Sequence, residues 1–285
     1  MVLRRVTARV RELGEELRNH RQAAGLSGQQ LADRLGWSAS KVSRIENGIL
    51  GVTEVDLVRY VAYCGLPSKE VDRLLELHRE PGTSGYWLSE RSSALIFHET
   101  TATSSTSYDP LLVPGLLQTE EYAAALIGDD RPELVRLRME RQSVLRNRPF
   151  EFFVHEQALR LPVGGNRVMN DQLLKLVLAS EHPLIAIRVV PGVLGACSAL
   201  GGEFVLFRYE GHRPLVYLDH GVLGVFLEHE SHVAKFYETI VDISHRALSW
   251  GQSRDMLAAM ANRFDRPEVP PDASHLAKEQ LQFRA

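Results

Sequence analysis

The chain has 285 residues, of which 44% are hydrophobic and 24% are charged, and its formal net charge at pH 7 is −3. These values lie close to the averages of globular proteins, which excludes a wholly disordered or fibrous chain, and the length predicts about two domains. No apolar run approaches the roughly 18 residues of a membrane span, and the N-terminus lacks the apolar stretch of a secretory signal. We therefore expect a soluble cytoplasmic protein without a membrane partner.

The distribution of charge and the cysteine content indicate the kind of binding partner and the redox compartment. Residues 1–50 contain nine Lys or Arg and five Asp or Glu, a local net charge of +4. An anionic partner is expected to bind where this excess lies. The two cysteines, Cys64 and Cys197, have no metal-type spacing around them, which fits a reducing compartment.

The first predicted helix is amphipathic and ends at Gly25. Residues at helical spacing form its inner face, and charged residues fill the other face. The inner residues are Val10, Leu13, Leu17, Arg21 and Ala24. Ser27 then fits the N-cap of a second helix, with Gln30 as its reciprocal capping partner.

Two short helices are predicted to meet at a tight corner. Gly36 ends the first of them after barely two turns, Ser38 can cap the next, and Asn47 with Gly48 ends that one. The inward residues are Leu31, Ala32, Leu35, Val42 and Ile45. Ala32 is small where the helices would cross, so the pattern predicts a helix-turn-helix.

The outward face of the second short helix carries small and basic side chains. These are Ala39, Ser40, Lys41, Ser43 and Arg44. Such a helix end can enter the major groove of DNA, contact thymine methyl groups, and donate to guanine or phosphate oxygens. The alternative is a plain helical hairpin with a solvated face. The coincidence of spacing, glycine and basic face favours the DNA-binding interpretation.

The segment LSGQQLADRLGWSASKVSRIENG resembles the Cro/repressor-like (XRE) helix-turn-helix family, and the resemblance covers about residues 10–80. It implies base-reading positions for Ala39, Ser40, Lys41 and Arg44, DNA-backbone positions for Gln29 and Asn47, and an ion pair between Arg21 and Glu46. Our predicted DNA-binding set is Gln29, Ser38, Ala39, Ser40, Lys41, Ser43, Arg44 and Asn47. Gly28 departs from the family, which often has a phosphate-binding Gln there, so anchoring should be weaker or supplied by Gln29.

Two more helices should complete an N-terminal domain over residues 1–80. Their predicted core residues are Val55, Val58, Val61 and Ala62, then Val71, Leu74, Leu75 and Leu77, with Cys64 packed among them. The breakers Pro81 to Gly85 predict a boundary, and we expect a hinge over residues 81–107. Residues 98–107 include seven Ser or Thr in ten positions, which fits a flexible linker or, slightly better, a strand joining the second domain.

Residues 108–264 predict an α+β domain with a mostly antiparallel sheet, followed by a tail over 265–285. The expected helices are 118–127, 132–146, 171–179, 230–248 and 253–263. The expected strands are 150–154, 184–190, 204–209, 215–219 and 222–227. The apolar segment 113–119 fits core packing, with a binding groove as the alternative.

Three further segments resemble the actinobacterial WhiJ-like, antitoxin-like regulators, which have a C-terminal domain of unknown function. They are YDPLLVPGLLQTEEYA, EQALRLPVGG and PGVLGACSALGGEFVLF. Together with the helix-turn-helix they extend the resemblance over about residues 10–264. It implies a small acidic protein partner encoded by an adjacent gene.

No catalytic or metal motif stands out in the second domain. His229 and His232 are three residues apart, one short of the zinc-protease spacing, and His220 and His245 complete no known pattern. No nucleophile elbow, phosphate loop or dinucleotide fingerprint occurs. We expect no catalytic activity, no metal and no cofactor.

These observations predict a sequence-specific regulator of transcription that binds double-stranded DNA as a homodimer and is associated with the nucleoid. Its C-terminal domain would respond to a small protein partner or ligand. The alternative is an antitoxin-like protein that mainly sequesters a small acidic partner encoded next to it, with autoregulation. An enzyme with an attached DNA-binding domain is the third, least supported class.

Overall fold

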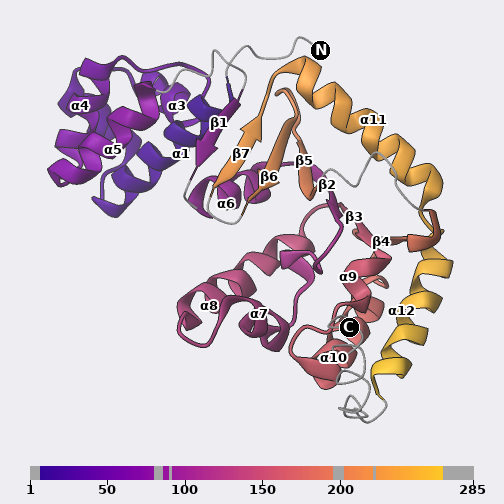
Figure 1. The fold of residues 1–285 in the computed structure, drawn as a ribbon. Helices are drawn as coiled ribbons and strands as arrows, with labels where there is room; N and C mark the ends of the chain where they lie inside the picture. The colour runs from indigo at the N-terminus through magenta and orange to yellow at the C-terminus, as the bar shows by residue number, and fades with distance from the viewer. Residues whose placement is uncertain (1–6, 80–85, 90–91, 195–201, 221–222, 266–285) are drawn as a thin grey trace, which may run out of the picture.

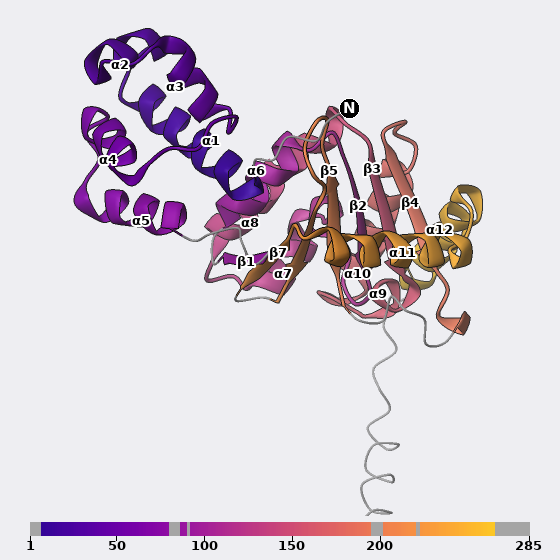
Figure 2. The same ribbon diagram turned by 90° about the horizontal axis from the view of Figure 1, so that it is seen from above.

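The computed structural model describes residues 7–79, 86–89, 92–194, 202–220 and 223–265 (Figure 1). Helices form the N-terminal domain, which stands at the β1 end of a larger domain built around a sheet (Figures 1 and 2). The N-terminal helices are α1 (Ala8–Ala23), α2 (Gly28–Leu35), α3 (Ala39–Glu46), α4 (Glu54–Tyr63) and α5 (Ser68–Arg79). None of the described helices is long and apolar enough to cross a membrane.

The local signals in the N-terminal sequence produce the expected helix ends. Ser27 and Gln30 form a capping box at the start of α2, and Ser38 caps α3 by accepting from the Lys41 backbone N–H over 3.1 Å. Gly36 ends α2 in the left-handed conformation, with a φ of 70°. The predicted helix-turn-helix is therefore confirmed.

The core of the N-terminal domain brings all five helices together. Leu17, Leu31, Leu57, Tyr60 and Leu74 are fully buried in it. Cys64 is half-buried against the same core, as predicted. The α4 prediction was wrong at Val55, Val58 and Ala62, which are exposed because Leu57, Tyr60 and Val61 form the inner face of that helix.

Gly14 allows α1 to pass directly over the end of α3. A Cβ at this position would lie 2.5 Å from the Ile45 carbonyl oxygen and 2.9 Å from that of Glu46. Ala normally stabilises a helix over Gly by about 1 kcal/mol. Here the clash is with backbone, so Gly14→Ala should instead lower the free energy of unfolding by about 1–3 kcal/mol.

Thermal and urea unfolding of the full chain measure this effect. Gly28→Ala is the matched control, since Gly28 is a helical glycine of the same domain with open space around it. It should be neutral or stabilising. If Gly14→Ala does not lower the melting temperature relative to Gly28→Ala, α1 does not pass this close to the end of α3.

In the described part of the chain, seven strands form one sheet in the order β1-β7-β6-β5-β2-β3-β4. Their bounds are β1 Tyr86–Ser89, β2 Ser104–Asp109, β3 Phe150–His155, β4 Ile185–Val190, β5 Phe204–Arg208, β6 Leu215–Asp219 and β7 Gly224–Leu227. Strands β2, β3 and β4 are parallel, and the other neighbours are antiparallel. The sheet is thus mixed, which corrects the prediction of a mostly antiparallel sheet.

Helices cover both faces of the sheet. The helices of this domain are α6 Ser92–Thr101, α7 Glu120–Ile127, α8 Pro132–Arg141, α9 Glu156–Arg160, α10 Gly165–Ala179, α11 Glu230–Arg246 and α12 Trp250–Phe264. Short 3-10 helices are η1 Gly115–Leu117, η2 Gln142–Arg146 and η3 Gly192–Leu194. The α7–η2 and α9–α10 segments cross over between parallel strands, which a hairpin cannot do, and this explains the mixed sheet.

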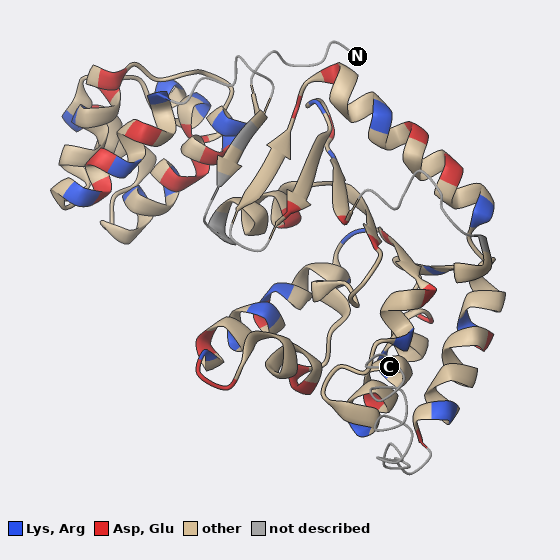
Figure 3. Cartoon of the chain, in the orientation of Figure 1, with Lys and Arg blue, Asp and Glu red and all other residues tan. Residues whose placement is uncertain are grey.

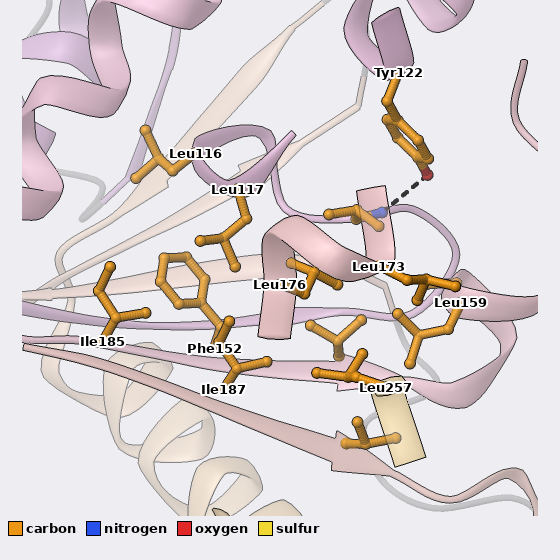
Figure 4. Packing of buried hydrophobic residues seen from close by; sticks show 14 of the residues in the cluster. Leu116, Leu117, Tyr122, Phe152, Leu159, Leu173, Leu176, Ile185, Ile187 and Leu257 are labelled. Atoms are coloured by element: carbon orange, nitrogen blue, oxygen red, sulfur yellow. Dashed lines mark hydrogen bonds between the residues drawn. The ribbon is translucent and has the colours of Figure 1, made fainter. Parts of the chain in front are cut away.

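The two faces have separate cores. On one face α10, α12 and η1 pack against β3 and β4 through residues such as Leu117, Phe152, Leu173, Ile187 and Leu257 (Figure 4). The other face packs against α11. The segment 113–119 therefore contributes to the core, with Leu117 fully buried and the Val113 N–H bonded to the Tyr122 hydroxyl.

The segment 81–107, predicted as a hinge, supplies β1, α6 and most of β2 to the sheet domain. In the Ser/Thr-rich run, the Thr100 and Thr101 hydroxyls donate to carbonyls of Ile96 and Phe97 within α6, while the strand begins only at Ser104. β-strand propensity alone could not predict which of these Ser and Thr residues end a helix and which form a strand. Residues 80–85, Cys197 and all of the predicted tail except Asp265 lie outside the described residues.

Candidate nucleic-acid interface

Helix α3 presents one row of polar side chains to solvent. Val42 and Ile45 are buried against the core of the N-terminal domain, and this fixes the rotation of the helix. Ser40, Ser43 and Arg44 are exposed on the opposite side. Asn47, directly after the helix, extends the same row because it lies one turn beyond Ser43.

Arg44 is the basic side chain of this row. Its Nε donates to the Ser40 carbonyl over 3.3 Å, which lays the side chain along α3 while the residue stays exposed. A guanidinium offers a planar fork of donors that matches guanine O6 and N7 or a phosphate. Arg44 is therefore the strongest base-reading candidate of the predicted set.

Lys41 does not extend outward as the sequence pattern predicted. Its Nζ lies 2.8 Å from Asp56 Oδ2 on α4 and 3.8 Å from the centroid of the Trp37 ring. The residue is half-buried, and so is its neighbour Ala39, which packs against the domain core. The helical pattern of α3 could not reveal Asp56, because that acid lies on another helix.

The remaining predicted residues lie at helix ends and are exposed. Gln29, in the first turn of α2, donates to Asp33 over 2.7 Å, and Ser38 caps α3. Asn47 donates to the Ser43 carbonyl over 2.7 Å and accepts from Arg18 of α1 over 2.5 Å. The pattern placed Arg18 only on the solvent side of α1, so its contact with the end of α3 was missed.

A buried ion pair fixes α3 against α1. Arg21 Nε and Nη2 lie 2.7 and 2.8 Å from the two carboxylate oxygens of Glu46, and Arg21 Nη1 donates to the Leu26 carbonyl. The Tyr60 hydroxyl of α4 also donates to Glu46 over 2.5 Å. Glu46 is 5% exposed and Arg21 9%. The ion pair implied by the XRE resemblance is confirmed.

The pKa of Glu46 reflects this network. Burial opposes ionisation, but the hydrogen bonds from Arg21 and Tyr60 outweigh it and hold the pKa below its ordinary value. The carboxylate is therefore charged at neutral pH, and the buried guanidinium is neutralised. The angle between α1 and α3 depends on this pair.

Charge is mixed over the surface of the N-terminal helices (Figure 3). Residues 51–79 contain five Asp or Glu and four Lys or Arg, so the positive excess of the domain belongs to residues 1–50. The exposed Arg44 lies within that part. Helices α2 and α3 themselves carry three basic and two acidic residues, so Arg44 is not part of a broad basic surface.

Only one group of three metal-ligand side chains converges within the described residues, and it consists of Glu16, His20 and Glu70. Arg73 forms ion pairs with both of these carboxylates. The rings of His229 and His232 lie 5.4 Å apart without a third ligand in such a group.

A short polar helix held at a fixed angle on a helical core is the architecture of a helix-turn-helix DNA-binding regulator. In agreement, a family model described as "Helix-turn-helix domain" matches residues 12–74. A second family model, described as "Domain of unknown function (DUF5753)", matches residues 93–259. That match covers more than half of the chain, and the protein belongs to this family.

No curated protein matches the chain. Among solved structures, one similar protein is the restriction-modification controller protein C.AhdI from Aeromonas hydrophila, seen in a high-resolution crystal structure. It is 29% identical, and the match covers 23% of this chain and 98% of that chain, with a TM-score of 0.22.

Proposed function

We propose that the protein is a sequence-specific, DNA-binding regulator of transcription that reads the major groove with α3. The observation that carries the proposal is the exposed row of Ser40, Ser43, Arg44 and Asn47 on a helix whose orientation is fixed by the buried Arg21–Glu46 pair. Arg44 would read guanine, and the hydroxyls would contact bases or phosphates. Gln29 and the N-terminus of α2 would contact the DNA backbone.

Mapping the genomic DNA bound by the full chain tests this proposal. We expect a limited set of enriched sites that share one sequence motif, located in promoters. Enrichment without a common motif would leave only non-specific electrostatic binding. No enrichment at all would contradict DNA binding.

We further propose that the protein binds DNA as a homodimer through α4. This helix exposes Val55, Val58 and Tyr63, with Val55 70% exposed. Helix-turn-helix proteins commonly pair two half-sites about one helical turn of DNA apart. Apolar residues on a helix beside the reading helix could hold two copies at such a spacing.

Val55→Glu is expected to shift the protein from dimer to monomer and to lower its affinity for a paired site by at least tenfold, because a charge would have to be buried between copies. Light scattering after size exclusion and gel shifts measure the two effects. Leu178→Glu is the control, since Leu178 on α10 is equally exposed, at 71%, but lies in the other domain. Unchanged mass for Val55→Glu, or a monomer for Leu178→Glu, would exclude this interface.

The sheet domain would act as the signal-receiving part of the regulator. It contacts α1 directly: the Ala8 N–H donates to Glu228 over 2.9 Å, and the Arg11 guanidinium lies 4.1 Å from the centroid of the Tyr209 ring. A change in the sheet domain can therefore reach the helix that braces α3. We assign it no catalytic step. Sequestration of a small acidic partner stays a prediction that rests on the WhiJ-like resemblance.

A further inference from the structure

A cavity of about 290 Å³ lies on the face of the sheet that carries α10, between the core beneath that helix and the core beneath α6. Strands β2, β3, β5 and β6, helices α6 and α8, and the segment 112–118 surround it. Its apolar wall includes Leu95, Val113, Phe150, Phe152 and Phe207. The volume suits a small organic molecule.

The central strand β2 is polar where it faces this cavity. Ser105, Ser107 and Asp109 alternate along the strand and line the cavity, while Tyr108 packs into the core on the opposite face. A strand between two neighbours in the middle of a sheet usually buries apolar side chains on a covered face. Polar groups at such a place need a polar partner.

The charges around the cavity leave the carboxylates in excess. Arg141 is bound by both oxygens of Glu99, at 2.9 and 2.6 Å, and Arg138 donates to the Gln118 side chain over 2.8 Å. Asp109 accepts from the Ser107 hydroxyl over 2.7 Å. Among the described residues, no salt bridge joins Asp109 or Glu203 to a Lys, Arg or His.

The pKa values of two carboxyl groups agree with the excess of carboxylates around the cavity. Burial, with Glu203 nearby, raises the pKa of Asp109 to about 8 against the hydrogen bond from Ser107. Burial and Asp219 raise the pKa of Glu203, although His220 and Arg138 oppose the shift. For Asp109, burial outweighs the one hydrogen bond that favours the ionised form, and for Glu203 burial and Asp219 outweigh the positive charges of His220 and Arg138.

We propose that the cavity binds a small organic ammonium ion, with its apolar body against Phe150, Phe152 and Phe207 and its charged group at Asp109 and Glu203. An ammonium group offers hydrogen-bond donors and further positive charge to these carboxylates, and the aromatic wall contacts the rest of the molecule. A bare metal ion fits less well, because these carboxylates do not converge as metal ligands do in the described structure.

Helix α6 connects this site to the N-terminal domain. Leu95 and Glu99 of α6 line the cavity, while Ala94 packs in one cluster with Ala8 of α1. His98 lies on the same helix, 2.8 Å from the Tyr209 hydroxyl, over which Arg11 is stacked. Occupancy of the cavity would thus shift α1. An effect of this shift on DNA binding rests on the proposed function. Binding of the ligand to the cavity does not rest on it.

Calorimetry and saturation-transfer NMR on the full chain without DNA test the site. The probes are 2-phenylethylamine and cyclohexylmethylamine, with 2-phenylethanol and 3-phenylpropionate as neutral and anionic counterparts. We expect saturable binding of the amines at one site per chain and at least tenfold weaker binding of the counterparts. Failure of both amines to bind, or equal binding of 3-phenylpropionate, would overturn the proposal.

Variants then locate the site. Asp109→Asn and, independently, Glu203→Gln should each weaken amine binding at least tenfold, while Asp242→Asn, which changes a partly exposed acid on α11 paired with Arg246, should leave it unchanged. Two variants keep the test decisive if one does not fold. Equal amine affinity in a folded Asp109→Asn or Glu203→Gln protein would exclude this cavity.

Adding DNA separates the inference from the proposed function. If amines bind but the affinity for DNA sites does not change, the ligand site stands and its regulatory consequence fails. If amines bind and no specific DNA site exists, the proposed function fails while the ligand site stands.

Discussion

Replacing Glu46 with Ala is expected to lower the free energy of unfolding of the N-terminal domain by about 3–5 kcal/mol, since it leaves the Arg21 guanidinium buried without its partner. It also removes the acceptor of the Tyr60 hydroxyl. Urea unfolding followed by circular dichroism measures the loss. Hydrogen exchange in α1 and α3 assigns it to the N-terminal domain.

Two controls distinguish a buried pair from charge removal in general. Glu54→Ala breaks a surface pair with Arg79, in which both side chains are largely exposed, and should change stability little. The double variant Arg21→Met with Glu46→Met should lose less than Glu46→Ala, because no unpaired charge is buried. If Glu46→Ala is as mild as Glu54→Ala, the pair does not brace the domain.

The same pair makes stability depend on pH. The folded-state pKa of Glu46 lies below the ordinary value of 4.5, so its contribution is fully present above that value and is lost as the pH falls through the lower, folded pKa. The stability difference between the parent and Glu46→Gln should therefore be constant near neutral pH and shrink on acidification. A difference that does not change between pH 7 and pH 3 would contradict the charge state assigned to Glu46.

Arg44→Ala should weaken binding to the best genomic site by about 10- to 100-fold, or about 1–3 kcal/mol, and relax the preference at one base pair. The reason is that Arg44 is the exposed guanidinium in the row on α3. Gel shifts against the parent site and its single-base variants measure both effects. A uniform loss on every sequence, with a smaller salt dependence, would instead assign Arg44 to a phosphate.

Two further variants serve as references for Arg44. Arg246→Ala removes an exposed arginine from α11 of the other domain and should not change DNA affinity. Lys41→Ala should mainly affect stability, because Nζ is held by Asp56 and lies over the Trp37 ring. If Lys41→Ala weakens DNA binding more than Arg44→Ala, the assignment of the reading face is wrong.

Helix ends and the buried sides of helices could be predicted, since they are determined by residues close together in the sequence. The capping box of Ser27 with Gln30 and the stop at Gly36 follow from residues three or four apart. The side of α3 that faces solvent follows from the burial of Val42 and Ile45 on the opposite side of the helix. The candidate interface was therefore largely predictable, apart from Lys41 and Ala39.

Features that join distant segments could not be predicted in the same way. Asp56 captures Lys41 from another helix, and β1 pairs with β7 across more than a hundred residues. The Ser/Thr-rich segment that includes β2 fitted a linker almost as well as a strand, because the burial of its polar side chains depends on the neighbouring strands β3 and β5. Crossover connections likewise made the sheet mixed.

Helix α1 belongs to both parts of the molecule. Leu13 and Leu17 lie in the N-terminal core, whereas Ala8 and Arg11 are buried against the sheet domain. A foreign helix-turn-helix grafted onto this sheet domain would have to reproduce that first turn as well as its own core. Any residue except proline could supply the N–H that Glu228 accepts at position 8, but the small Ala8 side chain in its cluster with Ala94 and the Arg11–Tyr209 contact depend on the residues of α1 itself.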